Sequence, residues 1–370
     1  MDEYKNDPTR WATSMAHHAE LLLPCLDAVG ARSVVEVGAF AGDLTGVLVD
    51  WAERSGARVV AVDPSPNDQL EALAEEHSGL ELIREPSLEA LGHLELPDAV
   101  IIDGDHNYYT VSEELRLIAE RAGSAGLPLL IFHDVAWPHA RRDDYFDPEL
   151  IPEDSRHPIA GTGGGIFPGD PGLRPDGVPY PKSAAHEGGP RNGVLTAVED
   201  FVAGREDLRL VVVPAFFGLG VAWERSANGA SELARILDPW DRNPMIERLE
   251  ANRVHHLAQD YARQVELWWR RERQARQEAV LQRLLRSSAF ALAERLSRLR
   301  MRAGVAPADS GVSKDEVRRA LGVPRPSASQ RGRSLTRTCW ERTHGSWLRS
   351  GPWTRSRRLR RGAPPRRCGG

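Results

Sequence analysis

From residue 31 onward, short apolar runs alternate with longer amphipathic segments. Five runs have the length and composition of buried strands: Ser33–Val37, Val59–Val62, Leu80–Ile83, Ala99–Ile102 and Leu129–Phe132. Three of the segments between them are the clearest helix candidates: Thr45–Arg54, Asn67–Glu76 and Val111–Arg121. This alternation is typical of a parallel sheet covered by helices. We therefore predict an α/β fold of the Rossmann-like kind.

The regular pattern stops after Asp134 and resumes with a predicted helix at Val194–Ala203. Two further apolar runs follow at Leu208–Val213 and Gly218–Trp223. Because these two strands are close in sequence, they predict an antiparallel hairpin. The expected sheet is therefore seven-stranded, mostly parallel, and ends in that hairpin.

The chain divides into segments of different composition. We expect an N-terminal helical segment at 1–30, the α/β domain at 31–225, and a helical or coiled-coil segment at 244–300. A lid-like insertion at 136–192 interrupts the domain, and a long loop of this kind is usually functional or disordered. The last segment, 304–370, is rich in Arg, Ser and Pro, and it is expected to lack ordered structure.

Charge separates the tail from the rest of the chain. The tail from Gly304 has 16 basic and four acidic side chains, whereas the preceding 303 residues have 32 basic and 49 acidic ones. An acidic body is a poor nucleic-acid binder, so a nucleic-acid partner is not expected.

The three cysteines, Cys25, Cys339 and Cys368, are far apart and form no paired motif. They support neither a disulfide framework nor a thiolate zinc site. The N-terminus is charged and the longest apolar stretch is broken by Pro and Gly, so we expect no secretory signal and no membrane span. Together these features favour a cytoplasmic protein.

A glycine-bearing turn follows the first predicted strand. Glu36 precedes it, and Gly38 and Gly42 allow a ligand to approach its backbone closely. The spacing differs from the dinucleotide fingerprint, whose middle glycine makes room for a pyrophosphate, so a nucleoside without phosphates fits better. Asp63 ends the next strand, where an acid can accept hydrogen bonds from ribose hydroxyls, although NAD would need the same acid.

These residues resemble the class I methyltransferases. Glu36, Gly38 and Gly42 look like the first motif of that superfamily, and Asp63 matches its ribose-binding acid. The resemblance implies S-adenosylmethionine as the cofactor, with the turn near its methionine part. Ser87, which follows the third strand, is assigned to the adenine end from its position alone.

A second set of polar residues follows the fourth and fifth strands. The fourth ends in Asp103-Gly-Asp105-His106 and the fifth in His133-Asp134. In an open parallel sheet ligands gather beyond the carboxyl ends of the strands, so these side chains are expected to face the cofactor crevice. A cation held there would lower the pKa of an acceptor hydroxyl, and a histidine would remove its proton. We expect Asp105 to serve as a turn or helix-cap residue.

The same stretch resembles a branch of metal-dependent O-methyltransferases that includes the macrolide sugar methyltransferases. The resemblance implies that Asp103 and Asp134 are metal ligands, and that His106 is the catalytic base beside Asp103. That family has Glu where this chain has His133, which is here taken as a ligand or as a strand-end histidine with no such role. Magnesium prefers oxygen ligands, so manganese or iron would tolerate this change better.

We therefore predict an S-adenosylmethionine-dependent O-methyltransferase acting on a hydroxyl of a sugar or glycosylated small molecule, with magnesium or another divalent cation. A metal-independent small-molecule methyltransferase is the first alternative. A non-catalytic scaffold that binds partners through its C-terminal helix is the second. The apolar spacing within 244–300 fits packing on the chain's own domain or a homodimer interface.

Overall fold

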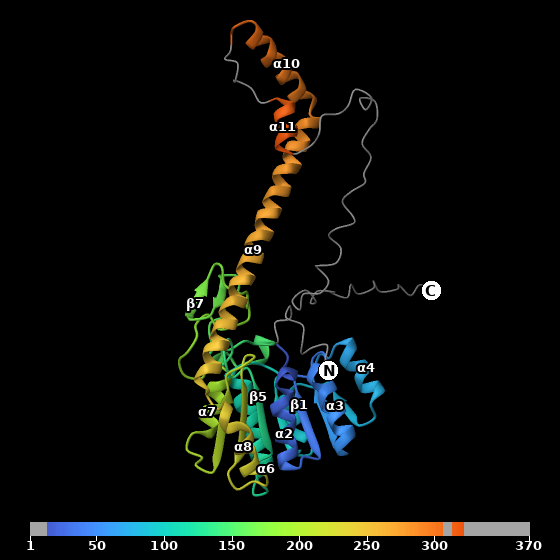
Figure 1. Ribbon diagram of the computed structural model, residues 1–370, viewed down its shortest axis with the longest axis vertical. Helices are drawn as coiled ribbons and strands as arrows, with labels where there is room; N and C mark the ends of the chain where they lie inside the picture. Colours follow the sequence, from blue (N-terminus) through green and yellow to red (C-terminus); the bar gives the residue numbers. More distant parts are fainter. Residues whose placement is uncertain (1–12, 306–312, 322–370) are drawn as a thin grey trace, which may run out of the picture. The chain divides into compact units, whose positions relative to one another are not determined.

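The computed structural model describes residues 13–305 and 313–321. The chain divides into two compact units, residues 1–269 and 270–370, and the sheet lies in the first. The predicted seven-stranded sheet is present, with the strand order β3-β2-β1-β4-β5-β9-β8 (Figure 1). Its strands are β1 (Ser33–Val37), β2 (Arg58–Val62), β3 (Leu80–Ile83), β4 (Ala99–Ile102), β5 (Leu129–His133), β8 (Leu208–Val213) and β9 (Leu219–Glu224).

The first five strands are parallel, and β9 pairs antiparallel with both β5 and β8. This arrangement confirms the predicted mostly parallel sheet that ends in an antiparallel hairpin. The strand order reverses between β1 and β4, so the crevice beyond their carboxyl ends is the topological switch point.

Helices cover both faces of the sheet because successive strand residues point to opposite sides. In β1, Val34 packs in one apolar core and Val35 in the other. The first core is completed by α2 (Ala19–Val29), α3 (Asp43–Ser55), α4 (Asp68–Glu76) and α8 (Ala230–Leu237). The second is completed by α5 (Ser87–His93), α6 (Tyr108–Ala122) and α7 (Val194–Val202). Within the N-terminal segment, the described residues form a short 3-10 turn, Met15–His18, that leads into α2.

Strand register brings the polar residues to one edge of the sheet. Val37 pairs with Val62 on one side and with Ile102 on the other, and Ile102 pairs with Phe132. The residues that follow these strands therefore lie along the same edge, as the sequence predicts.

The insertion at 136–192 has its own secondary structure. A short hairpin joins β6 (Gly165–Phe167) to β7 (Asp170–Arg174), and two 3-10 turns, Pro148–Leu150 and Glu153–Ser155, precede it. Its side chains include the buried Arg142, whose Nη1 donates to the Ala184 carbonyl oxygen at 2.7 Å. This hydrogen bond closes the insertion on itself.

The predicted helical segment is present as α9 (Pro244–Arg286), which runs from the first unit into the second, and α10 (Ser288–Arg302). A 3-10 turn, Asp238–Trp240, precedes α9. Near its start α9 buries Glu250, Val254 and Ala258.

A short helix, α11 (Lys314–Ala320), lies in the tail that was expected to lack structure. Ser313 and Glu316 form a capping box at its start. Their side chains accept hydrogen bonds from two backbone N–H groups that would otherwise have no partner, and this stabilises the first turn of the helix. The expectation was therefore wrong for residues 313–321. For residues 322–370 it falls outside the described part of the chain.

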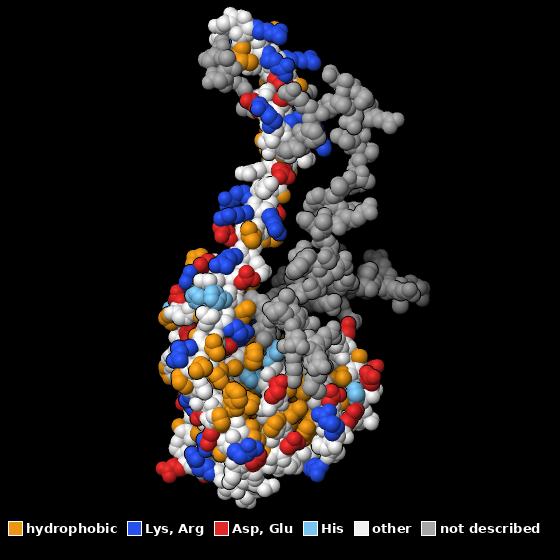
Figure 2. Space-filling view, in the orientation of Figure 1, with side chains coloured by type: hydrophobic (Ala, Val, Ile, Leu, Met, Phe, Trp, Pro, Cys, Tyr) orange, Lys and Arg blue, Asp and Glu red, His pale blue; other side chains and the backbone are white. Residues whose placement is uncertain are grey.

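The surface of the first unit is mixed in character. Figure 2 shows hydrophobic side chains gathered over the face that α2 and α8 cover, with acidic and basic side chains interspersed around them. Among the described residues, no helix has both the length and the apolar character needed to cross a bilayer.

Candidate active site

The glycine turn after β1 is held in place by Asp63. This carboxylate is buried, and its Oδ2 accepts the Phe40 backbone N–H at 2.7 Å. Its Oδ1 accepts the N–H of Ser65, also at 2.7 Å. A carboxylate oxygen can accept more than one hydrogen bond, so both oxygens keep capacity for ribose hydroxyls.

The two glycines are required by the backbone itself. Gly38 has φ 87°, and a Cβ there would lie 2.1 Å from the Asp103 carbonyl oxygen. The cofactor turn therefore touches the chain after β4 through bare backbone. Gly42 has φ 79° and caps the start of α3, a left-handed conformation that glycine adopts without strain.

Glu36 lies beneath this turn and is almost fully buried. Burial raises its pKa to about 8, although a hydrogen bond from the Thr45 hydroxyl to Oε2, 2.7 Å long, lowers it. The nearby carboxylates of Asp103 and Asp63 also raise the pKa. Glu36 is therefore held mainly protonated near neutral pH.

Ser87 is the first residue of α5, and its side chain neighbours the carboxyl group of Glu114 on α6. Glu114 has no exposed surface, and burial raises its pKa to about 8 while the Ser87 hydroxyl lowers it. No sequence pattern indicates that Glu114 is buried, because a glutamate in an amphipathic helix is normally assigned to the exposed face.

At the other end of the crevice the structure brings together Asp103, His133 and Asp134. One ligand atom from each lies within 4.8 Å of the other two. His133 Nδ1 is 3.0 Å from Asp103 Oδ1 and 3.4 Å from Asp134 Oδ2. Two carboxylates and one imidazole can hold a divalent cation, and the mixed donor set suits manganese or iron better than magnesium.

His133 is 3% exposed, and its other nitrogen is also engaged. Nε2 lies 3.1 Å from the Phe216 carbonyl oxygen. Burial lowers the His133 pKa, but the carboxylates of Asp103 and Asp134 outweigh it, and the pKa is raised well above the usual range. Without a cation, the ring is therefore held as an imidazolium between two carboxylates.

His106 forms a pair with Asp134. Its Nδ1 is 3.1 Å from Asp134 Oδ2, and since an ionised carboxylate can only accept, Nδ1 carries the hydrogen. Nε2 is then the nitrogen with a lone pair for an acceptor proton. Burial lowers the His106 pKa, but Asp134 and Asp103 outweigh this effect and the pKa is raised. Asp134 has a pKa below its usual range, because His133 and His106 together outweigh its burial.

The insertion contributes a third histidine, His139, to this region. The rings of His106 and His139 stack with centroids 4.9 Å apart and planes inclined by 12°. The Tyr180 ring meets His139 edge-on at 5.3 Å. Burial lowers the His139 pKa to about 3, so this ring is neutral at physiological pH.

The insertion is hydrogen-bonded to the loop that carries His106. The Asp144 N–H donates to the His106 carbonyl oxygen at 3.0 Å, and the Phe146 N–H donates to Asp105 Oδ1 at 2.8 Å. Asp105 also accepts the Thr110 hydroxyl at 3.0 Å. The cap of α6 is Asn107, and Asp105 has the first of its two expected roles, because it holds the turn before this helix.

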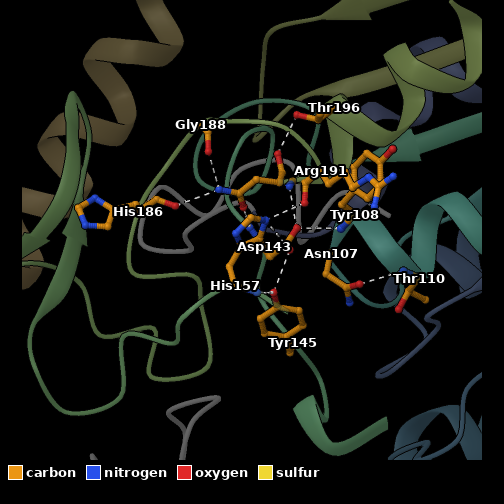
Figure 3. A network of polar contacts seen from close by, with 12 residues as sticks. Asn107, Tyr108, Thr110, Asp143, Tyr145, His157, His186, Gly188, Arg191 and Thr196 are labelled. Atoms are coloured by element: carbon orange, nitrogen blue, oxygen red, sulfur yellow. Dashed lines mark hydrogen bonds and ion pairs between the residues drawn. The ribbon is translucent and has the colours of Figure 1, made fainter. Parts of the chain in front are cut away.

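Asp143 anchors the insertion, as Figure 3 shows. Its fully buried carboxylate accepts the Tyr108 N–H at 2.8 Å and the Gly193 N–H at 2.7 Å through Oδ1. Oδ2 accepts the Tyr145 hydroxyl at 2.9 Å, and the Asp143 N–H donates to Asn192 Oδ1 at 2.8 Å. The network links both ends of the insertion to the first turn of α6, so this part of the insertion is a fixed wall of the site. No sequence motif pointed to this role.

Residues 35–135 match a family model described as a methyltransferase domain. No curated protein matches the sequence. Among solved structures, the chain is similar to the Podospora anserina methyltransferase PaMTH1 bound to SAH, with 17% identity, a TM-score of 0.39, and coverage of 60% of this chain and 85% of that one.

It is also similar to human N-acetylserotonin methyltransferase in complex with SAM. There the identity is 13%, the TM-score 0.31, and the coverage 56% of this chain and 51% of that one. The segment matched by the family model runs from β1 to β5 and includes the glycine turn. Residues 35–135 are therefore similar to a methyltransferase domain.

Proposed function

We propose that the protein is an O-methyltransferase that moves a methyl group from S-adenosylmethionine to a hydroxyl of a sugar or glycosylated small molecule. The observation that carries this proposal is the convergence of Asp103, His106, His133 and Asp134 at the edge of the sheet next to the cofactor turn. An alcohol is a poor nucleophile until its proton is removed, and this cluster offers a positioned base.

S-adenosylmethionine, when bound, supplies an electrophilic methyl group on a sulfonium. Glu36, Gly38, Gly42 and Asp63 are the residues proposed to hold it, with Ser87 at the adenine end. His106 Nε2 takes the proton of the acceptor hydroxyl while Asp134 holds Nδ1–H. The bound cofactor would supply its methyl group to the hydroxyl oxygen, and the electron pair of its carbon–sulfur bond would stay on sulfur.

Asp103, His133 and Asp134 are proposed to hold a divalent cation that fixes the acceptor oxygen and lowers its pKa. The Phe216 carbonyl beside His133 Nε2 supports this role, because a metal-bound histidine commonly donates its other N–H to such a partner. Stacked rings and polar groups of the insertion, His139 and Tyr180 among them, suit a sugar acceptor.

A metal-independent small-molecule methyltransferase is the second candidate, and one observation favours it. The pair of His106 and Asp134 is complete without a cation, and an imidazolium at His133 can balance the two carboxylates. The scaffold alternative is disfavoured by a cofactor turn that keeps both of its glycines and its acid.

The test is methyl transfer by the full chain with a panel of sugar and glycoside acceptors, measured as formation of S-adenosylhomocysteine. The proposal expects turnover that falls on chelation and returns with Mn²⁺. Turnover that is unchanged by the chelator would favour the metal-independent enzyme. If calorimetry shows no binding of S-adenosylhomocysteine, with or without metal, both enzyme proposals are overturned and the non-catalytic scaffold remains.

The part of the helical segment beyond Ala258 is proposed as a homodimer contact. Trp268 and Trp269 are more than half exposed, and Leu292, Leu296 and Leu299 form an exposed row on α10. Light scattering of the wild type and of a Trp268→Glu variant would test this, since a monomer in both would overturn it. A reducing location such as the cytoplasm is proposed from the buried free thiol of Cys25.

A further inference from the structure

The loop between β8 and β9 presses against the reaction site in a strained conformation. Phe216 has φ 47° and Phe217 has φ 68°, both in the left-handed region that residues with side chains rarely adopt. Residues in this conformation persist where surrounding contacts impose it. One contact here is the Ala136 N–H, which donates to the Phe217 carbonyl oxygen at 2.7 Å.

The peptide group between Phe216 and Phe217 connects two side chains from distant parts of the chain. Its carbonyl oxygen lies 3.1 Å from His133 Nε2, and its N–H donates to Glu250 Oε1 at 2.9 Å. A carbonyl oxygen can only accept, so His133 Nε2 must carry a hydrogen. One peptide plane therefore joins a carboxylate of α9 to the imidazole of the reaction site.

Glu250 is well placed to fix this peptide. Its carboxylate is 8% exposed and receives two hydrogen bonds from Arg253, each 2.6 Å long. The Arg253 guanidinium in turn lies over the Phe217 ring, 4.6 Å from its centroid. Contacts among Glu250, Arg253 and Phe217 therefore fix the position of the β8–β9 loop.

Charge on Glu250 also acts on the peptide electronically. A carboxylate that accepts a peptide N–H polarises that peptide and makes its carbonyl oxygen a stronger acceptor. The stronger acceptor favours the histidine form with hydrogen on Nε2. That form leaves Nδ1 directed at Asp103 and Asp134.

We propose that Glu250 is a positioning residue of the active site, which acts through the Phe216–Phe217 peptide to fix the orientation and tautomer of His133. This inference rests on the proposed cation-binding role of His133. Under this proposal the start of α9 has a function beyond packing or dimerisation. Without the Glu250 carboxylate, the peptide that contacts His133 would lack its acceptor.

The test compares Glu250→Ala with Glu250→Gln in the full chain. The alanine removes the acceptor of the Phe217 N–H, whereas the glutamine amide oxygen can still accept it. We expect Glu250→Ala to weaken Mn²⁺ binding by about 10-fold, within the range known for partners of metal-bound histidines, and Glu250→Gln to recover most of it. The kcat should fall with the Mn²⁺ affinity, while the KM for S-adenosylmethionine stays unchanged.

A matched control is Glu232→Ala on α8, which breaks an exposed pair with Arg235 that has the same spacing and touches no part of the site. Glu250→Asp replaces the alanine variant if that variant does not fold. Aspartate keeps the charge, but its shorter side chain places the carboxylate farther from the Phe217 N–H. Unchanged Mn²⁺ affinity in folded Glu250→Ala or Glu250→Asp would overturn the inference.

The ¹⁵N NMR signals of the His133 ring separate this inference from the proposed function. If the wild type binds no Mn²⁺ and transfers no methyl group, the cation role fails. A change in the His133 Nε2 signal in Glu250→Ala, absent from Glu232→Ala, would still support the link through the peptide. An unchanged signal would overturn the link whatever the activity.

Discussion

The two ends of the crevice are assembled from different amounts of the chain. The proposed cofactor end takes four of its five residues from one strand–turn–helix–strand unit between Glu36 and Asp63, and the fifth, Ser87, follows β3. The proposed reaction end combines the loops after β4 and β5 with the insertion, the β8–β9 loop and the start of α9. The second end therefore draws on more segments that are far apart in sequence.

This difference indicates which substitutions can alter cofactor binding without altering catalysis, and which can do the reverse. A side chain at the cofactor end is fixed by its own strand and turn. At the reaction end, Asp134 and His133 are fixed by partners that are themselves held by other loops. Substitutions at the two ends should therefore separate cofactor binding from catalysis, and each prediction below tests that separation.

The largest effect is expected from His106→Ala. Loss of the base should lower kcat by roughly 10²- to 10⁴-fold, while affinity for S-adenosylhomocysteine stays unchanged. Steady-state kinetics and calorimetry on the same preparation measure both quantities. His93→Ala, which removes an exposed histidine of α5, is the control. A kcat within twofold of wild type would exclude His106 as the base.

The next largest effect is expected from Asp63→Ala, on cofactor binding. The variant loses the acceptor of two backbone N–H groups and of the ribose hydroxyls, so affinity for S-adenosylhomocysteine should fall by about 100-fold. Asp103→Ala should change that affinity by less than about threefold. Equal losses in the two variants, measured by calorimetry, would contradict the separation of the two ends.

An intermediate effect is expected from Asp143→Asn, which weakens the anchor of the insertion. An asparagine cannot accept with its amide nitrogen, so one of the three donors to Asp143 is left without its partner. We expect kcat/KM for the acceptor to fall by about tenfold with cofactor affinity unchanged. Asp147→Asn, at the start of a surface 3-10 turn, provides the comparison. An equal effect of the two substitutions would show that the anchor is not specific.

The smallest effect on cofactor binding and catalysis is expected from Glu114→Gln. This substitution should change the free energy of unfolding instead. Burial raises the pKa of Glu114 from its ordinary value of 4.5 to about 8, so the folded state retains a proton that the unfolded state loses. The stability from this proton is fully present below the unfolded pKa and is lost as pH rises through the folded pKa.

Glutamine mimics the protonated form at every pH. The variant should therefore match the wild type near pH 4 and exceed its free energy of unfolding by about 4 kcal/mol near pH 8. Urea unfolding at both pH values measures the difference, with Glu113→Gln as the neighbouring control. A constant difference across pH would show that Glu114 does not titrate as described.

The contrast between locally formed and distantly assembled parts of the site also explains which features could be predicted from the sequence. Strand and helix positions follow from apolar periodicity, so β1, β3, β4 and β8 were predicted at their observed bounds. Asp103, His133 and Asp134 were expected at one edge because they follow strands of a parallel sheet, and the structure places them together. Local pattern is sufficient where a strand end alone positions a side chain.

The remaining contacts could not be predicted because no local pattern encodes them. Asp143 is one of two adjacent aspartates in a loop, and only tertiary hydrogen bonds distinguish its buried carboxylate from an exposed one. Glu250 resembles any charged residue of a polar helix, and its contact with Phe217 depends on a left-handed loop that the sequence does not signal. Helix α11 differs from these contacts, because its capping box of Ser313 and Glu316 does have a sequence signature.

The bare-backbone contact at Gly38 bears on how such an enzyme changes its substrate during evolution. No side chain sets the spacing between the cofactor turn and Asp103, because a Cβ at position 38 would overlap the Asp103 carbonyl group. If the insertion binds the acceptor as proposed, substitutions there would change the acceptor contacts and leave the spacing between the glycine turn and Asp103 unchanged.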